Sequence, residues 1–136
     1  MNIQTALKTP KTFETPKELE KFWYDVCNSE LKFAIEICDQ YDEHVKIQIN
    51  LLQSLICNKP YVESNKNDLQ LATETLHKFS GSLALLGFPR HSQRIHLLEL
   101  QFINQTASLN QARFDYIQTQ VWEVSTLIRQ HILRAA

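Results

Sequence analysis

The sequence predicts an all-α protein, an antiparallel up-down-up-down four-helix bundle with a short additional helix at its N-terminus. Of the 136 residues, 43% are hydrophobic, and apolar side chains recur at spacings of three and four over several stretches. Only two glycines and four prolines are present, which are too few turn-forming residues for the many tight turns of a β-sandwich or a β-barrel. This amount of apolar material suits the core of one domain.

The first helix is short and follows a leader. Residues 1–15 lack sustained periodicity and are expected to form a partly ordered leader, whereas residues 16–136 form the single domain. Thr15, Pro16 and Glu18 are residue types favoured at the N-cap, the first and the third position of a helix. Apolar residues then recur at helical spacing: Leu19, Phe22, Trp23 and Val26.

Longer helices follow, joined by short connections. Their apolar stripes predict helices over residues 29–57, 68–86, 90–105 and 110–134. Pro60 lies in the polar break after the first of them, and Gly87 with Pro89 is expected to end the second. The second of these helices has the clearest core stripe, formed by Leu69, Ala72, Leu76, Phe79, Leu83 and Leu86.

Charge, hydropathy and cysteine spacing exclude several classes of protein. A net charge of −1 and a pI of about 6.5 argue against nucleic-acid binding. No apolar run is long enough to span a membrane, and no secretory signal is recognisable, so we expect a cytoplasmic protein without a membrane partner. Cys27, Cys38 and Cys57 form no Cys-x-x-Cys pair, which favours buried free thiols. His91 and His96 are five residues apart, so no metal site is expected.

Both glycines lie close to one histidine, within residues 76–88. A glycine inside a helix costs about 1 kcal/mol relative to alanine, so Gly81 needs a reason. It lies one helical turn after His77, where a side chain with a Cβ would crowd the imidazole. Ser80 and Ala84 have small side chains, which leave the surface next to the ring accessible. A neutral, accessible imidazole is nucleophilic and suited to take a phosphoryl group from a partner's acyl phosphate.

Residues 77–82, His-Lys-Phe-Ser-Gly-Ser, followed by Gly87, resemble the signature of histidine-containing phosphotransfer (HPt) domains. That signature reads approximately His-x-Leu-Lys-Gly-Ser/Ala, with a second glycine some six residues on. The resemblance implies that His77 is the phosphoacceptor, that Phe79 packs in the core, and that Gly81 provides clearance. It also implies that Gly87 ends the helix.

One position departs from the family pattern. HPt domains usually have a lysine three residues after the histidine, where this chain has Ser80. The nearest cation is Lys78, about 100° round the helix from the histidine. The resemblance implies that Lys78, Ser80 and Gly81 support the phosphate site, with Ser80 offering only a hydroxyl. We therefore expect slower transfer or a less stable phosphohistidine. Residues 95–99, Ile-His-Leu-Leu-Glu, are similar to the family's next helix.

The surface around His77 is the predicted docking site for a partner domain. Its residues are Thr73, Glu74, Ala84, Leu85 and Phe88. For Leu85 and Phe88, packing in the core is an equally good interpretation. Lys78, Arg90 and Arg94 would steer an acidic partner, although for each of them taken singly ordinary solvated charge is the better interpretation.

The resemblance implies a phosphorelay intermediate. His77 would accept a phosphoryl group from the receiver-domain aspartate of a hybrid sensor histidine kinase and pass it to the receiver of a response regulator. The receiver would supply Mg²⁺, and the chain, which has no nucleotide-binding glycine loop, would be a monomeric carrier without cofactor or autokinase activity. Two alternatives remain. One is a helical adaptor that binds receiver or kinase domains without being phosphorylated, and the other is a helical subunit of unrelated function.

Overall fold

The computed structural model describes residues 16–57 and 66–133, and these residues are almost entirely helical. In this part of the chain 88% of residues are helical and none lies in a β-strand. The predicted all-α class is therefore confirmed. The leader at residues 1–15 and the break around Pro60 lie outside the described residues.

The described helices follow the predicted order. They are α2 (Pro16–Lys21), the π-helical turn η1 (Phe22–Val26), α3 (Leu31–Cys57), α4 (Lys66–Leu86), α5 (Pro89–Ile103), α6 (Gln111–Ile128) and the π-helical turn η2 (Arg129–Leu133). α3 begins later than predicted because Asn28 and Ser29 adopt left-handed backbone conformations, with φ of 53° and 58°. α5 ends earlier than predicted because Gln105, with φ of 58°, turns the chain away from the helix.

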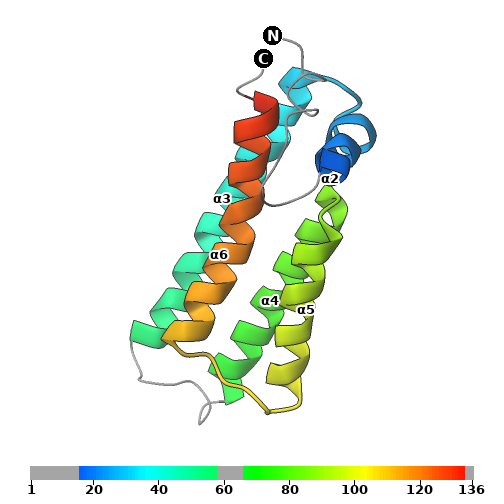
Figure 1. Cartoon of the computed structure of the whole chain (residues 1–136). Helices are drawn as coiled ribbons and strands as arrows, with labels where there is room; N and C mark the ends of the chain where they lie inside the picture. Colours follow the sequence, from blue (N-terminus) through cyan, green and yellow to red (C-terminus); the bar gives the residue numbers. More distant parts are fainter. Residues whose placement is uncertain (1–15, 58–65, 134–136) are drawn as a thin grey trace.

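The four longer helices lie side by side and form a helical bundle (Figure 1). α4 packs most extensively against α5, and α3 packs against α6. Further contacts join α3 to α4 and α5 to α6, so each long helix touches two others. The largest fully buried side chains come from every one of these helices and from the short first helix, and include Leu19, Phe22, Leu52, Phe79, Ile95, Phe102 and Ile117.

The predicted core stripe of α4 faces the interior. Leu76, Phe79 and Leu83 are completely buried, as is Ala72, and Leu69 is partly buried against the same core. Because these residues occupy one side of the helix, the opposite side of α4 faces solvent. His77 lies on that outer side.

Gly87 ends α4 in the way that its position predicts. Its φ is +92°, and its backbone N–H donates to the Ala84 carbonyl oxygen at 3.1 Å, while the N–H of Phe88 donates to Leu83 at 3.0 Å. These two hydrogen bonds form a Schellman motif, which satisfies carbonyls that the helix end would leave unpaired. Phe88 is thereby turned into the core, where its ring lies 6.3 Å from that of Phe22.

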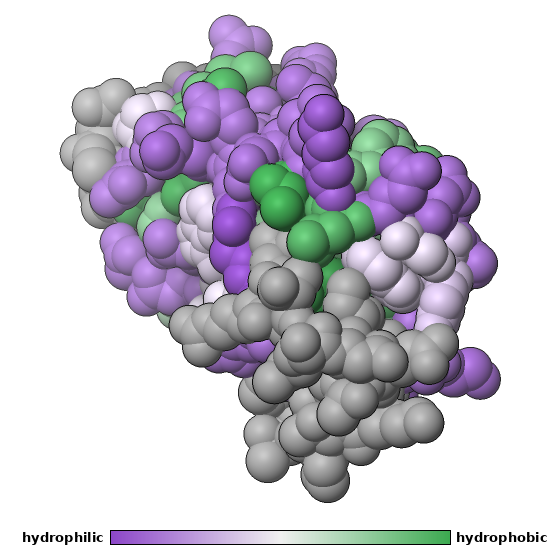
Figure 2. Space-filling model, turned by 90° about the horizontal axis from the view of Figure 1, so that it is seen from above, coloured by the Kyte–Doolittle hydropathy of each residue, from purple (hydrophilic) through white to green (hydrophobic). Residues whose placement is uncertain are grey.

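The prediction that Phe88 belongs to a docking surface is therefore wrong. Its side chain is completely buried between the α4–α5 turn and the first helix. In Figure 1, α2 lies beside this turn at one end of the bundle. Seen from that end, hydrophilic residues cover most of the described surface, and hydrophobic residues show in several small patches between them (Figure 2). None of the helices in residues 16–57 and 66–133 has the length and apolarity needed to cross a bilayer.

Two cysteines behave as predicted. Cys27 and Cys38 are buried free thiols, and burial raises the pKa of the Cys27 thiol to about 11. Burial also raises the pKa of Cys38, with a further contribution from nearby Asp42. The side chain of Cys57 lies outside the described residues.

His44 differs from the expectation of a freely solvated side chain. It is only partly exposed, and its ring packs edge-on against Phe79 with the ring centres 6.1 Å apart. Burial lowers the pKa of His44, and the positive charge of Lys78 lowers it further. The reason is the close approach of α3 to α4, which no local pattern along α3 reveals.

Candidate functional site

His77 projects from the outer face of α4, and its side chain is 77% exposed. One ring nitrogen nevertheless has a fixed partner, because Nδ1 lies 3.1 Å from Oε2 of Glu99 on α5. The Glu99 side chain is only 8% exposed. It lies on the face of α5 that also buries Ile95, Leu98 and Phe102. The imidazole is thus both accessible and oriented.

This contact determines which ring nitrogen of His77 is available for reaction. An ionised carboxylate can only accept hydrogen bonds, so this contact favours the tautomer in which Nδ1 of His77 carries the proton and donates the hydrogen bond to Glu99. In the neutral imidazole, Nε2 then keeps its lone pair. In this tautomer Nε2 is the ring nitrogen that could act as a nucleophile.

The second oxygen of Glu99 contacts another histidine. Nδ1 of His96 lies 3.4 Å from Oε1 of Glu99, and the His96 side chain is 44% exposed. One buried carboxylate therefore contacts two imidazoles. The sequence contained a signal for this arrangement, because a glutamate on the apolar stripe of an amphipathic helix requires a polar partner. The candidate site residues predicted from sequence did not include Glu99 or His96.

A shallow hollow of about 310 Å³ lies beside His77. It is lined by Thr73, Glu74, His77, Lys78 and Glu99. The structure thus brings three of the predicted residues, Thr73, Glu74 and Lys78, to the surface next to the histidine. Glu74 accepts a hydrogen bond from the Gln70 side-chain amide at 3.1 Å, and the Thr73 hydroxyl donates to the Leu69 carbonyl oxygen at 2.8 Å.

Ser80 contacts the neighbouring helix. Its hydroxyl lies 3.2 Å from the Ser92 hydroxyl on α5, and the Ser92 hydroxyl donates to the Ser80 carbonyl oxygen at 2.8 Å. These reciprocal hydrogen bonds join α4 to α5. The Ser80 hydroxyl, which the resemblance places beside a phosphate, therefore has a partner on the neighbouring helix in the unmodified protein.

Gly81 faces open space. A Cβ added at this position would meet no atom within 4 Å, apart from the adjacent backbone of its own helix. Packing against the described part of the chain therefore does not require a glycine here. Ala84 is exposed as well, and Leu85 is 81% exposed, so both lie on the outer surface of α4 beyond Gly81.

The two arginines expected to steer a partner are engaged elsewhere. Nε of Arg90 lies 3.7 Å from a carboxylate oxygen of Glu18 on α2. The guanidinium of Arg94 donates to the side-chain oxygen of Gln120 on α6 at 3.1 Å. Lys78 is the cation that lines the hollow beside His77.

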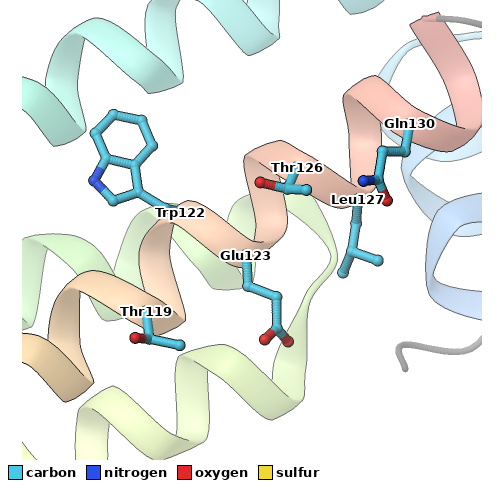
Figure 3. A pocket seen from close by; sticks show the side chains of 6 residues that line it. All are labelled: Thr119, Trp122, Glu123, Thr126, Leu127 and Gln130. Carbon is cyan, nitrogen blue, oxygen red and sulfur yellow. The ribbon is translucent and has the colours of Figure 1, made fainter. Parts of the chain in front are cut away.

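A second hollow, of about 350 Å³, runs along the C-terminal part of the bundle. Its lining side chains come from α6 and η2 (Figure 3): Thr119, Trp122, Glu123, Thr126, Leu127 and Gln130. Glu123 contacts Nε2 of the completely buried His91 at 2.9 Å. None of the predicted site residues lies in this hollow, and within residues 16–57 and 66–133 no group of three or more His, Cys, Asp or Glu side chains could hold a metal ion.

No family model matches this sequence, and comparisons with curated proteins and with solved structures find no match either.

Proposed function

We propose that this protein is a phosphorelay intermediate that carries a phosphoryl group on Nε2 of His77. The observation that supports this most directly is the combination of a 77% exposed imidazole with a buried carboxylate bound to its Nδ1. The buried Glu99 fixes the tautomer, and the bare surface at Gly81 leaves room for a second protein to approach. A surface histidine without a function needs neither feature.

The chemistry follows from this arrangement. Nε2 of His77 attacks the phosphorus of an aspartyl phosphate on a receiver domain, the Nε2–P bond forms, and the P–O bond to the aspartate breaks. The aspartate leaves as a carboxylate, so no proton needs to be added to it. Positive charge develops on the imidazole during the attack, and Glu99 stabilises it through the Nδ1–H hydrogen bond. The reverse reaction on a second receiver completes the relay.

The carrier exchanges phosphoryl groups with two receiver domains. The donor is the receiver domain of a hybrid sensor histidine kinase, and the acceptor is the receiver of a response regulator, each supplying its own Mg²⁺. The carrier is an up-down-up-down antiparallel bundle that works as a cytoplasmic monomer, binds neither nucleic acid nor membrane, and has no autokinase activity. The docking surface contains Thr73, Glu74, Ala84 and Leu85 around His77, with Lys78 as its cation.

One observation favours a second candidate, a helical adaptor that binds receiver or kinase domains without being phosphorylated. The Ser80 hydroxyl, at the position where HPt domains usually have a lysine, is hydrogen-bonded to Ser92. Because residue 80 is a serine, the phosphate site lacks the lysine that the family pattern leads one to expect. The adaptor and the carrier would share a docking surface but differ in chemistry at His77.

Phosphoryl transfer tests the proposal. The wild type, His77→Gln and His96→Gln are each incubated with Mg²⁺ and a panel of phosphorylated receiver domains from the source organism, and acid-labile, base-stable label is followed. We expect label on the wild type and on His96→Gln, which tests whether the neighbouring imidazole is the acceptor instead, and none on His77→Gln. Binding to a receiver without transfer of label would indicate the adaptor, and label on His77→Gln would refute the assignment of the acceptor.

A further inference from the structure

The hollow beside His77 has more negative than positive charge. Its lining contains the carboxylates of Glu74 and Glu99 and a single ammonium group, that of Lys78. Arg90 and Arg94 do not line it, because they contact Glu18 on α2 and Gln120 on α6. A phosphoryl group on His77 therefore enters surroundings whose fixed charge is already negative.

The two carboxylates act on different parts of a phosphohistidine. Glu99 contacts Nδ1 of His77, so its charge faces the imidazole, which becomes positive when Nε2 is phosphorylated. Glu74 lies one helical turn before His77, where Cβ atoms three residues apart are about 5–6 Å from each other. Its carboxylate accepts a hydrogen bond from Gln70 and has no partner of opposite charge among the described contacts. Its charge acts on the oxygens of the phosphoryl group.

We propose that Glu74 destabilises the phosphorylated state of His77 and so biases this carrier towards donating its phosphoryl group. This inference rests on the proposed function. It concerns the equilibrium of phosphoryl transfer between His77 and a receiver aspartate, which it places on the side of the phosphorylated receiver. Repulsion between a carboxylate and the doubly charged phosphoryl group raises the free energy of phosphohistidine relative to the unmodified site. With serine in place of lysine three residues after His77, Lys78 is the cation left to oppose this effect.

The size of the effect follows from Coulomb's law with solvent screening. A single and a double negative charge about 7 Å apart at a wet surface should shift the transfer equilibrium by about two- to fivefold at physiological salt. At about 1 M salt the Debye length falls to about 3 Å, so most of the shift should disappear. This salt dependence separates repulsion from a change in packing.

The test compares Glu74→Gln with the wild type and with Glu36→Gln, a matched control at an exposed position of α3. Glutamine at position 74 can still accept the hydrogen bond from Gln70. Each carrier is phosphorylated with phosphoramidate, in which Nε2 of the histidine displaces ammonia from phosphorus. It is then mixed with one Mg²⁺-loaded receiver domain until the ratio of phosphorylated carrier to phosphorylated receiver is constant.

We expect Glu74→Gln to raise that ratio about two- to fivefold at 0.15 M salt, to lose most of the increase at 1 M salt, and Glu36→Gln to match the wild type. An unchanged ratio for Glu74→Gln, an equal rise for Glu36→Gln, or a rise that does not depend on salt would overturn the inference while leaving the carrier function intact. If the wild type exchanges phosphoryl groups with no receiver, the proposed function fails, and the inference fails with it.

Discussion

Replacing Gly81 by alanine should stabilise the protein and slow phosphoryl transfer at His77. Gly81 is exposed in the interior of α4, and an added Cβ would meet no atom within 4 Å beyond the adjacent helix backbone. Alanine at an exposed helical position is favoured over glycine by about 1 kcal/mol, and the structure offers no clash to offset this gain. A glycine that costs stability and relieves no contact with the described residues is what the proposed approach of a receiver domain would require.

Gly87 provides the matched control, because the same substitution there should have the opposite sign. Its φ of +92° lies in the left-handed region, which costs a residue with a side chain about 1–2 kcal/mol. The added Cβ would lie 3.5 Å from Cγ of Lys21, an ordinary van der Waals distance. The backbone conformation therefore sets the cost of Gly87→Ala.

Urea unfolding followed by circular dichroism measures both effects. We expect the free energy of unfolding to rise by about 1 kcal/mol for Gly81→Ala and to fall by about 1–2 kcal/mol for Gly87→Ala. The rate of phosphoryl transfer from a phosphorylated receiver is then compared for Gly81→Ala, the bulkier Gly81→Gln and the wild type. Transfer should slow in the order of side-chain size.

Two results would refute the reasoning about Gly81. Destabilisation by Gly81→Ala would mean that the fold itself needs the glycine. Wild-type transfer rates in both Gly81 variants, with the fold intact, would mean that no partner approaches α4 closely at this position.

Three further predictions concern the site and the core. Glu99→Gln should slow transfer to His77 by about tenfold or more, because the hydrogen bond to Nδ1 loses its charge, whereas a wild-type initial rate would show that Glu99 does not assist the reaction. Phe88→Ala should lower the free energy of unfolding in urea by about 3–5 kcal/mol, and a loss below about 1 kcal/mol would contradict the burial of this ring. Because burial raises the pKa of Cys27 from 9.0 to about 11, its contribution to stability should be complete below pH 9 and should decline as the pH rises towards 11. Unfolding measured at pH 8 and pH 10.5 should show a smaller decline in Cys27→Ala, and equal declines would contradict this shift.

The sequence alone determined the helices and the orientation of α4. Apolar residues at spacings of three and four come from the geometry of a single helix, so the stripe that includes Leu76, Phe79 and Leu83 identified the buried face without knowledge of its neighbours. It followed that His77 faces outward. The end of α4 could be predicted as well, because a glycine in a left-handed conformation is a local requirement of the chain.

The tertiary structure decided which residues meet across helices. Glu99 lies 22 residues after His77, and only the packing of α5 against α4 brings its carboxylate to Nδ1. The same packing joins Ser80 to Ser92, a contact that the sequence of α4 does not reveal. Leu85 and Phe88 were equivalent in the sequence, but one is 81% exposed and the other is completely buried. Hydrophobicity and spacing describe one helix at a time, whereas these outcomes depend on where the neighbouring helices lie.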